Sequence, residues 1–112
     1  MDFLDLAKKR YSVRSYKKTP VEEEKVACIL EAARVAPSAA NLQPTRLVVI
    51  DNAEGMEKLS RAANVYSAPL AIIVCADHAK AWKRPADGKS TVDIDASIAT
   101  DHMMMEATSL GL

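Results

Sequence analysis

The chain has 112 residues, enough for one compact domain with its own core and too few for two. Hydrophobic residues make up 49% and charged residues 27% of it, which excludes a polar, disordered chain. Its 15 basic and 15 acidic residues cancel, so the broad positive field that non-specific nucleic-acid binding requires is absent, and we expect neither DNA nor RNA as a partner.

The N-terminal segment and the two cysteines indicate a reducing compartment. Asp2 and Asp5 stand where a signal peptide has positive charge, and no stretch approaches the roughly 18 apolar residues of a membrane span. We therefore expect a cytoplasmic protein with no membrane partner. Cys28 and Cys75 lie in unrelated apolar segments without metal-ligand spacing, so we expect two buried free thiols and no metal site.

Two helices are predicted in the first third of the chain. Residues 3–7 form a short amphipathic pattern that ends at the basic run 8–10, where positive charge suits a helix C-terminus. Thr19 and Pro20, followed by three acids, predict a second helix with Thr19 as its N-cap and Pro20 in its first turn. Apolar residues at helical spacing continue this helix to about Val35.

Two apolar segments farther along the chain predict strands. Residues 46–50 and 70–76 are rich in β-branched side chains, and both are expected to be buried on two faces. Residues 54–63 between them have a helical pattern, so the order is strand, helix, strand, which is typical of an α/β or mixed sheet. Residues 78–90 carry a proline, a glycine and four basic side chains, and predict an exposed loop.

Residues 92–110 predict a final helix that is apolar over much of its circumference. Ile94, Ile98 and Met105 form one stripe. Ala96, Ala99, Met103, Ala107 and Leu110 form another, which we expect beside the first. Because one core needs only one stripe, this is either a central helix covered on both sides by its own chain or a helix shared with a symmetric dimer interface.

Arg10, Ser12 and Arg14 alternate in a short segment after the first helix. In an extended chain they would project to the same side and present planar charged donors together with a hydroxyl, which suits a phosphate monoester. The alternative interpretation is an ordinary solvated basic segment.

The loop before the first strand gathers polar side chains among small residues. Ser38, Asn41 and Gln43 are accompanied by alanines, so the backbone can approach a ligand closely. Asn41 and Gln43 each offer a donor and an acceptor, which the amide and imide edge of a heterocycle requires. The alternative is a plain helix-to-strand connection in which Ser38 and Asn41 make turn hydrogen bonds.

Taken together, these segments resemble the FMN-dependent nitroreductase family. The resemblance extends over nearly the whole chain, in the family's order, through the segments Arg10–Tyr16, Pro20–Glu22, Ile29–Ala33, Ala36–Pro44, Leu47–Ile50, Ala68–Pro69 and Glu106–Leu112. It implies an α+β fold with a mixed sheet flanked by helices, and residues 1–112 forming a single, partial FMN-binding domain. We expect the chain to end before the family's C-terminal part.

The resemblance also implies the residues that bind the cofactor. Arg10, Ser12 and Arg14 would hold the FMN phosphate and ribityl chain. The loop of the other subunit would reach the flavin ring through Pro37, Ser38, Ala39 and Asn41, with Gln43 nearby on the ring's polar edge. The implied activity is ping-pong reduction of nitroaromatics, quinones or similar acceptors by NAD(P)H in a homodimer. Because the flavin carries the chemistry, no catalytic acid or base is expected.

Two other functions are also compatible with the sequence. The chain could be a flavin-binding module that stores or senses FMN without turnover, or a structural fragment that binds no flavin. The colour of the purified protein and its NAD(P)H-dependent activity distinguish the three.

Overall fold

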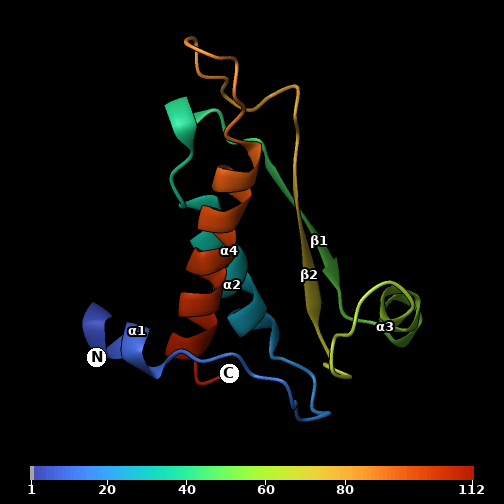
Figure 1. The fold of residues 1–112 in the computed structure, drawn as a ribbon. Helices are drawn as coiled ribbons and strands as arrows, with labels where there is room; N and C mark the ends of the chain where they lie inside the picture. The colour runs from blue at the N-terminus through green and yellow to red at the C-terminus, as the bar shows by residue number, and fades with distance from the viewer. Residues whose placement is uncertain (1) are drawn as a thin grey trace.

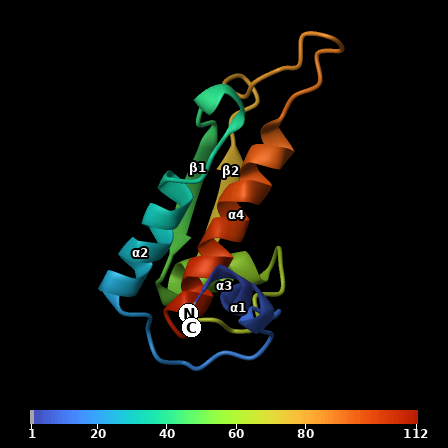
Figure 2. The ribbon, with the colours of Figure 1, turned by 90° about the vertical axis from the view of Figure 1, so that its left-hand side faces the viewer.

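The computed structural model describes residues 2–112. Its elements occur in the order α1 (Phe3–Lys9), α2 (Glu23–Arg34), the 3-10 turn η1 (Ala39–Asn41), β1 (Thr45–Ile50), α3 (Ala53–Ser60), β2 (Ala71–Ala76) and α4 (Val92–Ser109). Helix α4 packs against both α2 and the sheet, with α1 near its C-terminal end (Figures 1 and 2). The predicted α+β class is confirmed. None of the helices within residues 2–112 is long and apolar enough to span a membrane.

The two strands pair in antiparallel fashion, with Thr45 opposite Ala76 and Ile50 opposite Ala71. The strand–helix–strand segment is therefore not a parallel crossover unit. Alternate side chains point to opposite faces of a sheet, and Val48 and Ile73 are 47% and 37% exposed. The prediction that both strands are buried on two faces is wrong, because the described helices that pack on the sheet cover one of its faces.

Both cysteines are exposed, which corrects the prediction of buried thiols. Cys75 lies on β2 with Ile73, on the exposed face of the sheet. Cys28 precedes Ile29, the residue that α2 buries most fully, and therefore points away from the helix's packed side. Apolar neighbours in sequence predicted burial, but the face on which each thiol stands decided the outcome.

Helix α2 begins later than predicted. Thr19 does not cap it; Glu22 is the N-cap residue, and its carbonyl accepts from the amides of Lys25 and Val26. The fixed φ of Pro20 suits extended backbone as well as a first helical turn. The helix starts where the acidic residues meet its N-terminal amides, a position that the macrodipole favours. Its end at Arg34, before Pro37, agrees with the prediction.

The core runs along α4. Its buried side chains, Val92, Asp95, Ala99 and Met103, recur at helical spacing, and α2, which carries the buried Ile29, packs along it. Ile94, from the other predicted stripe, is 55% exposed. At 100° per residue, Ile94 lies about 140° and 180° around the helix from Ala99 and Met103, and Ile98 lies about 100° and 140° from them. The two apolar stripes are therefore well separated around the helix rather than adjacent.

Residues 78–90 form the predicted exposed loop, which extends beyond the N-terminal end of α4 (Figure 1). A bridge between Lys83 and Ser90 closes it, and its base is anchored by the buried Ala81. At its tip the Arg84 guanidinium bonds the Asp87 carboxylate and thereby lowers the pKa of that carboxyl. The bridge and the ion pair both lie within the loop itself.

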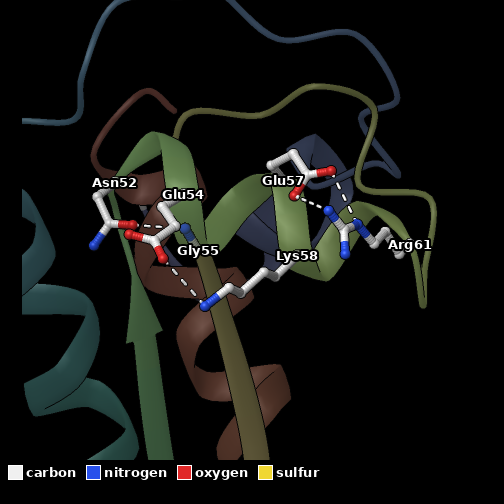
Figure 3. A network of polar contacts seen from close by, with 6 residues as sticks. All are labelled: Asn52, Glu54, Gly55, Glu57, Lys58 and Arg61. Carbon is white, nitrogen blue, oxygen red and sulfur yellow. Dashed lines mark hydrogen bonds and ion pairs between the residues drawn. The ribbon is translucent and has the colours of Figure 1, made fainter.

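Helix α3 is held mainly by local contacts (Figure 3). Asn52 is its N-cap and accepts from the Gly55 amide at 2.7 Å, while Glu54–Lys58 and Glu57–Arg61 form exposed ion pairs at 3.2 and 2.9 Å. A Cβ on Gly55 would lie 2.7 Å from Ile50 Cγ2, so glycine allows the helix to approach the end of β1.

We expect Asn52→Ala to lower the free energy of unfolding by about 1 kcal/mol, because the Gly55 amide loses its capping acceptor. Lys58→Ala should change it by less than about 0.5 kcal/mol, since exposed ion pairs contribute little. Urea denaturation of both variants measures these changes. An equal loss of unfolding free energy in the two variants would contradict the conclusion that the Asn52 cap contributes more than the Glu54–Lys58 ion pair.

Candidate functional site

The segment from Arg10 to Arg14 lies outside any helix or strand. Arg10 is the C-cap of α1, with φ −64° and ψ 129°, and its amide donates to the Leu6 carbonyl. The Arg10 side chain is half-buried, whereas Ser12 and Arg14 are exposed. The backbone of Arg10 is therefore extended, and the exposed Ser12 and Arg14 follow it along the surface.

Arg10 and Arg14 differ from the other arginines of the chain in their hydrogen-bond and ion-pair partners. Arg34, Arg61 and Arg84 are paired with carboxylates three or four residues away. Arg46 donates to the backbone carbonyls of Gln43 and Thr45. Within residues 2–112, no hydrogen bond or ion pair engages the side chains of Arg10, Ser12 or Arg14. Their donors are therefore available to an external anion.

The loop between α2 and β1 has a strained backbone. Ala40, Asn41 and Gln43 have φ values of 51°, 54° and 52°, in the left-handed region that favours glycine. Asparagine tolerates this region, but alanine and glutamine do not, and each such residue costs on the order of 1 kcal/mol or more. Strain of this kind persists only where surrounding contacts impose it.

Hydrogen bonds within the loop supply part of that support. Ser38 Oγ accepts from the Gln43 amide at 3.0 Å, and Asn41 Oδ1 accepts from Gln43 Nε2 at 3.3 Å. The next residue, Pro44, is fully buried, and its carbonyl accepts from the Asp77 amide. Ser38 and Asn41 thus make the turn bonds expected of a plain connection. Asn41 and Gln43 remain exposed, with donor and acceptor capacity to spare.

Asp95 is a residue that sequence reasoning missed. It is 2% exposed; its Oδ1 accepts from the Ala39 amide at 3.0 Å and its Oδ2 from Thr91 Oγ1 at 2.9 Å. The sequence alone suggests that Asp95 is one of two acidic residues in the first turn of α4, where the helix dipole favours negative charge. The available signal was its spacing from Val92 and Ala99, which places a carboxylate on the buried apolar stripe.

The structure does not bring the two polar segments together within one chain. Residues 10–14 lie near the C-terminal end of α4, whereas residues 37–43 lie near its N-terminal end, as both ribbon views show (Figures 1 and 2). The 18 residues of α4 correspond to a length of about 27 Å. Within one chain, the two segments are therefore held apart at opposite ends of this helix.

The chain is an α+β domain with exposed polar segments at both ends of its central helix, and comparisons identify the family to which it belongs. The nitroreductase family matches residues 7–65, more than half of the chain. A protein of Methanothermobacter thermautotrophicus, provisionally named NADH dehydrogenase/NAD(P)H nitroreductase, is 39% identical over 116 residues, covering 100% of this chain. The chain thus belongs to the nitroreductase family.

Solved structures agree with this assignment. A nitroreductase family protein of Clostridium difficile 630 is 58% identical, with a TM-score of 0.97 over 99% of this chain. An FMN-dependent nitroreductase of Clostridium difficile R20291 is 35% identical, with a TM-score of 0.85 over 97% of it. The chain spans 58% of the archaeal relative and 64% and 62% of these two structures.

Proposed function

We propose that residues 1–112 form part of the FMN-binding domain of a cytoplasmic NAD(P)H oxidoreductase, which reduces nitroaromatics, quinones or similar small acceptors. Family membership supports the reaction class, and the FMN-dependent relative from Clostridium difficile supports the cofactor. The observation that carries the proposal is that Arg10, Ser12 and Arg14 have no polar partner among residues 2–112, because these donors have the chemistry that a phosphate requires.

Arg10 and Arg14 would hold the FMN phosphate, with Ser12 donating to the phosphate or the ribityl chain. Charge-assisted bonds from guanidinium groups are about twice as strong as neutral ones. The side chains need not break an internal hydrogen bond or ion pair to offer them, since they have none among the described residues.

The polar edge of the flavin would meet the loop of the second subunit. Pro37, Ser38 and Ala39 would approach the ring, while Asn41 and Gln43 would offer donors and acceptors to its heteroatoms. Separation of the two segments along α4 supports a site shared between chains (Figure 1). The exposed apolar stripe that contains Ile94 supports a homodimer.

When bound, FMN supplies the redox chemistry, accepting hydride from NAD(P)H and delivering electrons to the second substrate in alternate half-reactions. The chain's part is to bind and orient the isoalloxazine ring with its polar edge against amide groups. We assign no residue of this chain as a catalytic acid or base.

The absorbance spectrum of the purified full-length protein tests the proposal. We expect a yellow protein with flavin bands, stoichiometric FMN after denaturation, and NAD(P)H oxidation that accelerates when a quinone or nitroaromatic is added. Bound flavin without NAD(P)H oxidation would favour a storage or sensing module. A colourless protein that fails to bind added FMN would favour a structural role and refute the proposal.

A further inference from the structure

We infer that Asp95 is a positioning residue that holds the loop of residues 37–43 in its FMN-contacting conformation, an inference that rests on the flavin site proposed above. A carboxylate that is 2% exposed needs hydrogen-bond partners to remain buried. Asp95 has two, and they come from different segments. One is the Ala39 amide in the loop, and the other is the Thr91 hydroxyl at the start of α4.

The Ala39 amide has no alternative acceptor within its own turn. It is the first residue of η1, and Ser38, which precedes it, makes no side-chain capping bond to the turn. Ser38 Oγ instead accepts from the Gln43 amide, which closes the other end of the loop. Asp95 therefore takes the capping role from 56 residues further along the chain.

The bond between Asp95 and Ala39 lies directly before the strained part of the loop. Ala40 and Asn41, the next two residues, have left-handed backbones that relax when the loop is released. Helix α4 is the central helix of the fold, so a side chain on its buried stripe is a rigid attachment point. Thr91, whose amide also donates to the Trp82 carbonyl, orients the second carboxylate oxygen.

If Asp95 holds the loop, its removal reduces the fraction of molecules whose loop is competent to bind. The apparent dissociation constant rises as the inverse of that fraction. Loss of a charge-assisted hydrogen bond corresponds to a factor of about 10 to 100. Asp95→Asn keeps an oxygen acceptor for Ala39 and an amide group that can donate to Thr91 Oγ1, so it should restore most of the affinity.

The experiment compares Asp95→Ala, Asp95→Asn and Met103→Ala in the full-length protein. Met103 lies on the same buried stripe of α4, about two turns away, and serves as the control for general loss of stability. FMN titration measures affinity, and hydrogen exchange of the flavin-free protein reports on the Ala39 amide. Thermal unfolding shows that each variant is folded at the temperature of the titration.

We expect Asp95→Ala to bind FMN about 10- to 100-fold more weakly and to lose protection at Ala39, while the α2 and α4 amides stay protected. Met103→Ala should unfold at lower temperature yet keep its affinity and its Ala39 protection. If Asp95→Ala matches the wild type in affinity and exchange, or if Met103→Ala loses FMN equally, the inference is overturned. A wild-type protein that binds no FMN refutes the proposed function instead.

Discussion

Ile98→Asp is expected to convert a flavin-binding homodimer into monomers that have lost FMN. The outer face of α4 forms a shallow apolar hollow, lined by Asp93, Ile94, Ser97, Ile98, Asp101 and His102. Ile98 lies about 100° around the helix from Ala99 and is only half-buried, so its replacement disturbs the packing of α4 within its own chain less than a change on the buried stripe does. In the proposed homodimer this face is covered by the partner.

A carboxylate introduced there would be buried without a partner in each of two symmetric copies. An uncompensated buried charge costs about 3 to 5 kcal/mol, which weakens association by more than about a hundredfold per copy. Because the proposed cofactor site uses the phosphate segment of one chain and the loop of another, FMN should be lost together with the dimer.

Sedimentation velocity with detection at the flavin wavelength measures mass and cofactor at once. Ile98→Leu is the matched control, since it keeps apolar volume and should remain a yellow dimer. A wild-type monomer that retains FMN, or an Ile98→Asp dimer that stays yellow, would show that the shared-site arrangement is wrong.

Arg10→Ala and Arg14→Ala are each expected to weaken FMN binding by about 1.5 to 3 kcal/mol, or roughly 10- to 150-fold. Each substitution removes a charge-assisted hydrogen bond to the phosphate without breaking an internal hydrogen bond or ion pair, because the described residues offer neither side chain a polar partner. Folding stability should therefore stay close to that of the wild type. Fluorescence titration of the protein depleted of flavin measures the affinity.

Arg34→Ala is the matched control for charge. Its guanidinium is exposed but already paired with Glu31, Nη2 to Oε1 at 2.6 Å, so its removal changes net charge equally and should leave FMN affinity unchanged. Titration with riboflavin, which lacks the phosphate, should show almost no difference between Arg14→Ala and the wild type. Unchanged FMN affinity in both arginine variants would remove the segment from the phosphate site.

The sequence alone predicts those features whose physics is local. It predicts a helix over residues 92–110, and α4 spans Val92–Ser109, because apolar spacing within a helix is set by a period of 3.6 residues. The exposed loop at residues 78–90 also agrees with the prediction. Basic residues at a helix C-terminus, and the proline and glycine of a loop, affect mainly the backbone of their neighbours in the sequence. Their effect therefore does not depend on the rest of the fold.

Features that depend on which surfaces meet were decided by the tertiary structure. Cys28 and Cys75 stand in apolar sequence yet are exposed, because the described elements pack on the other face of α2 and of the sheet. Asp95 is polar yet buried. Its carboxylate accepts a hydrogen bond at 3.0 Å from the Ala39 amide, and these two residues are 56 positions apart in the sequence, so local patterns could not predict the contact. The two polar segments were identified from their residue types, but their separation to opposite ends of α4 resulted from packing (Figure 2). Periodicity and capping act within one or two turns, whereas burial and separation depend on contacts between residues that the sequence places far apart.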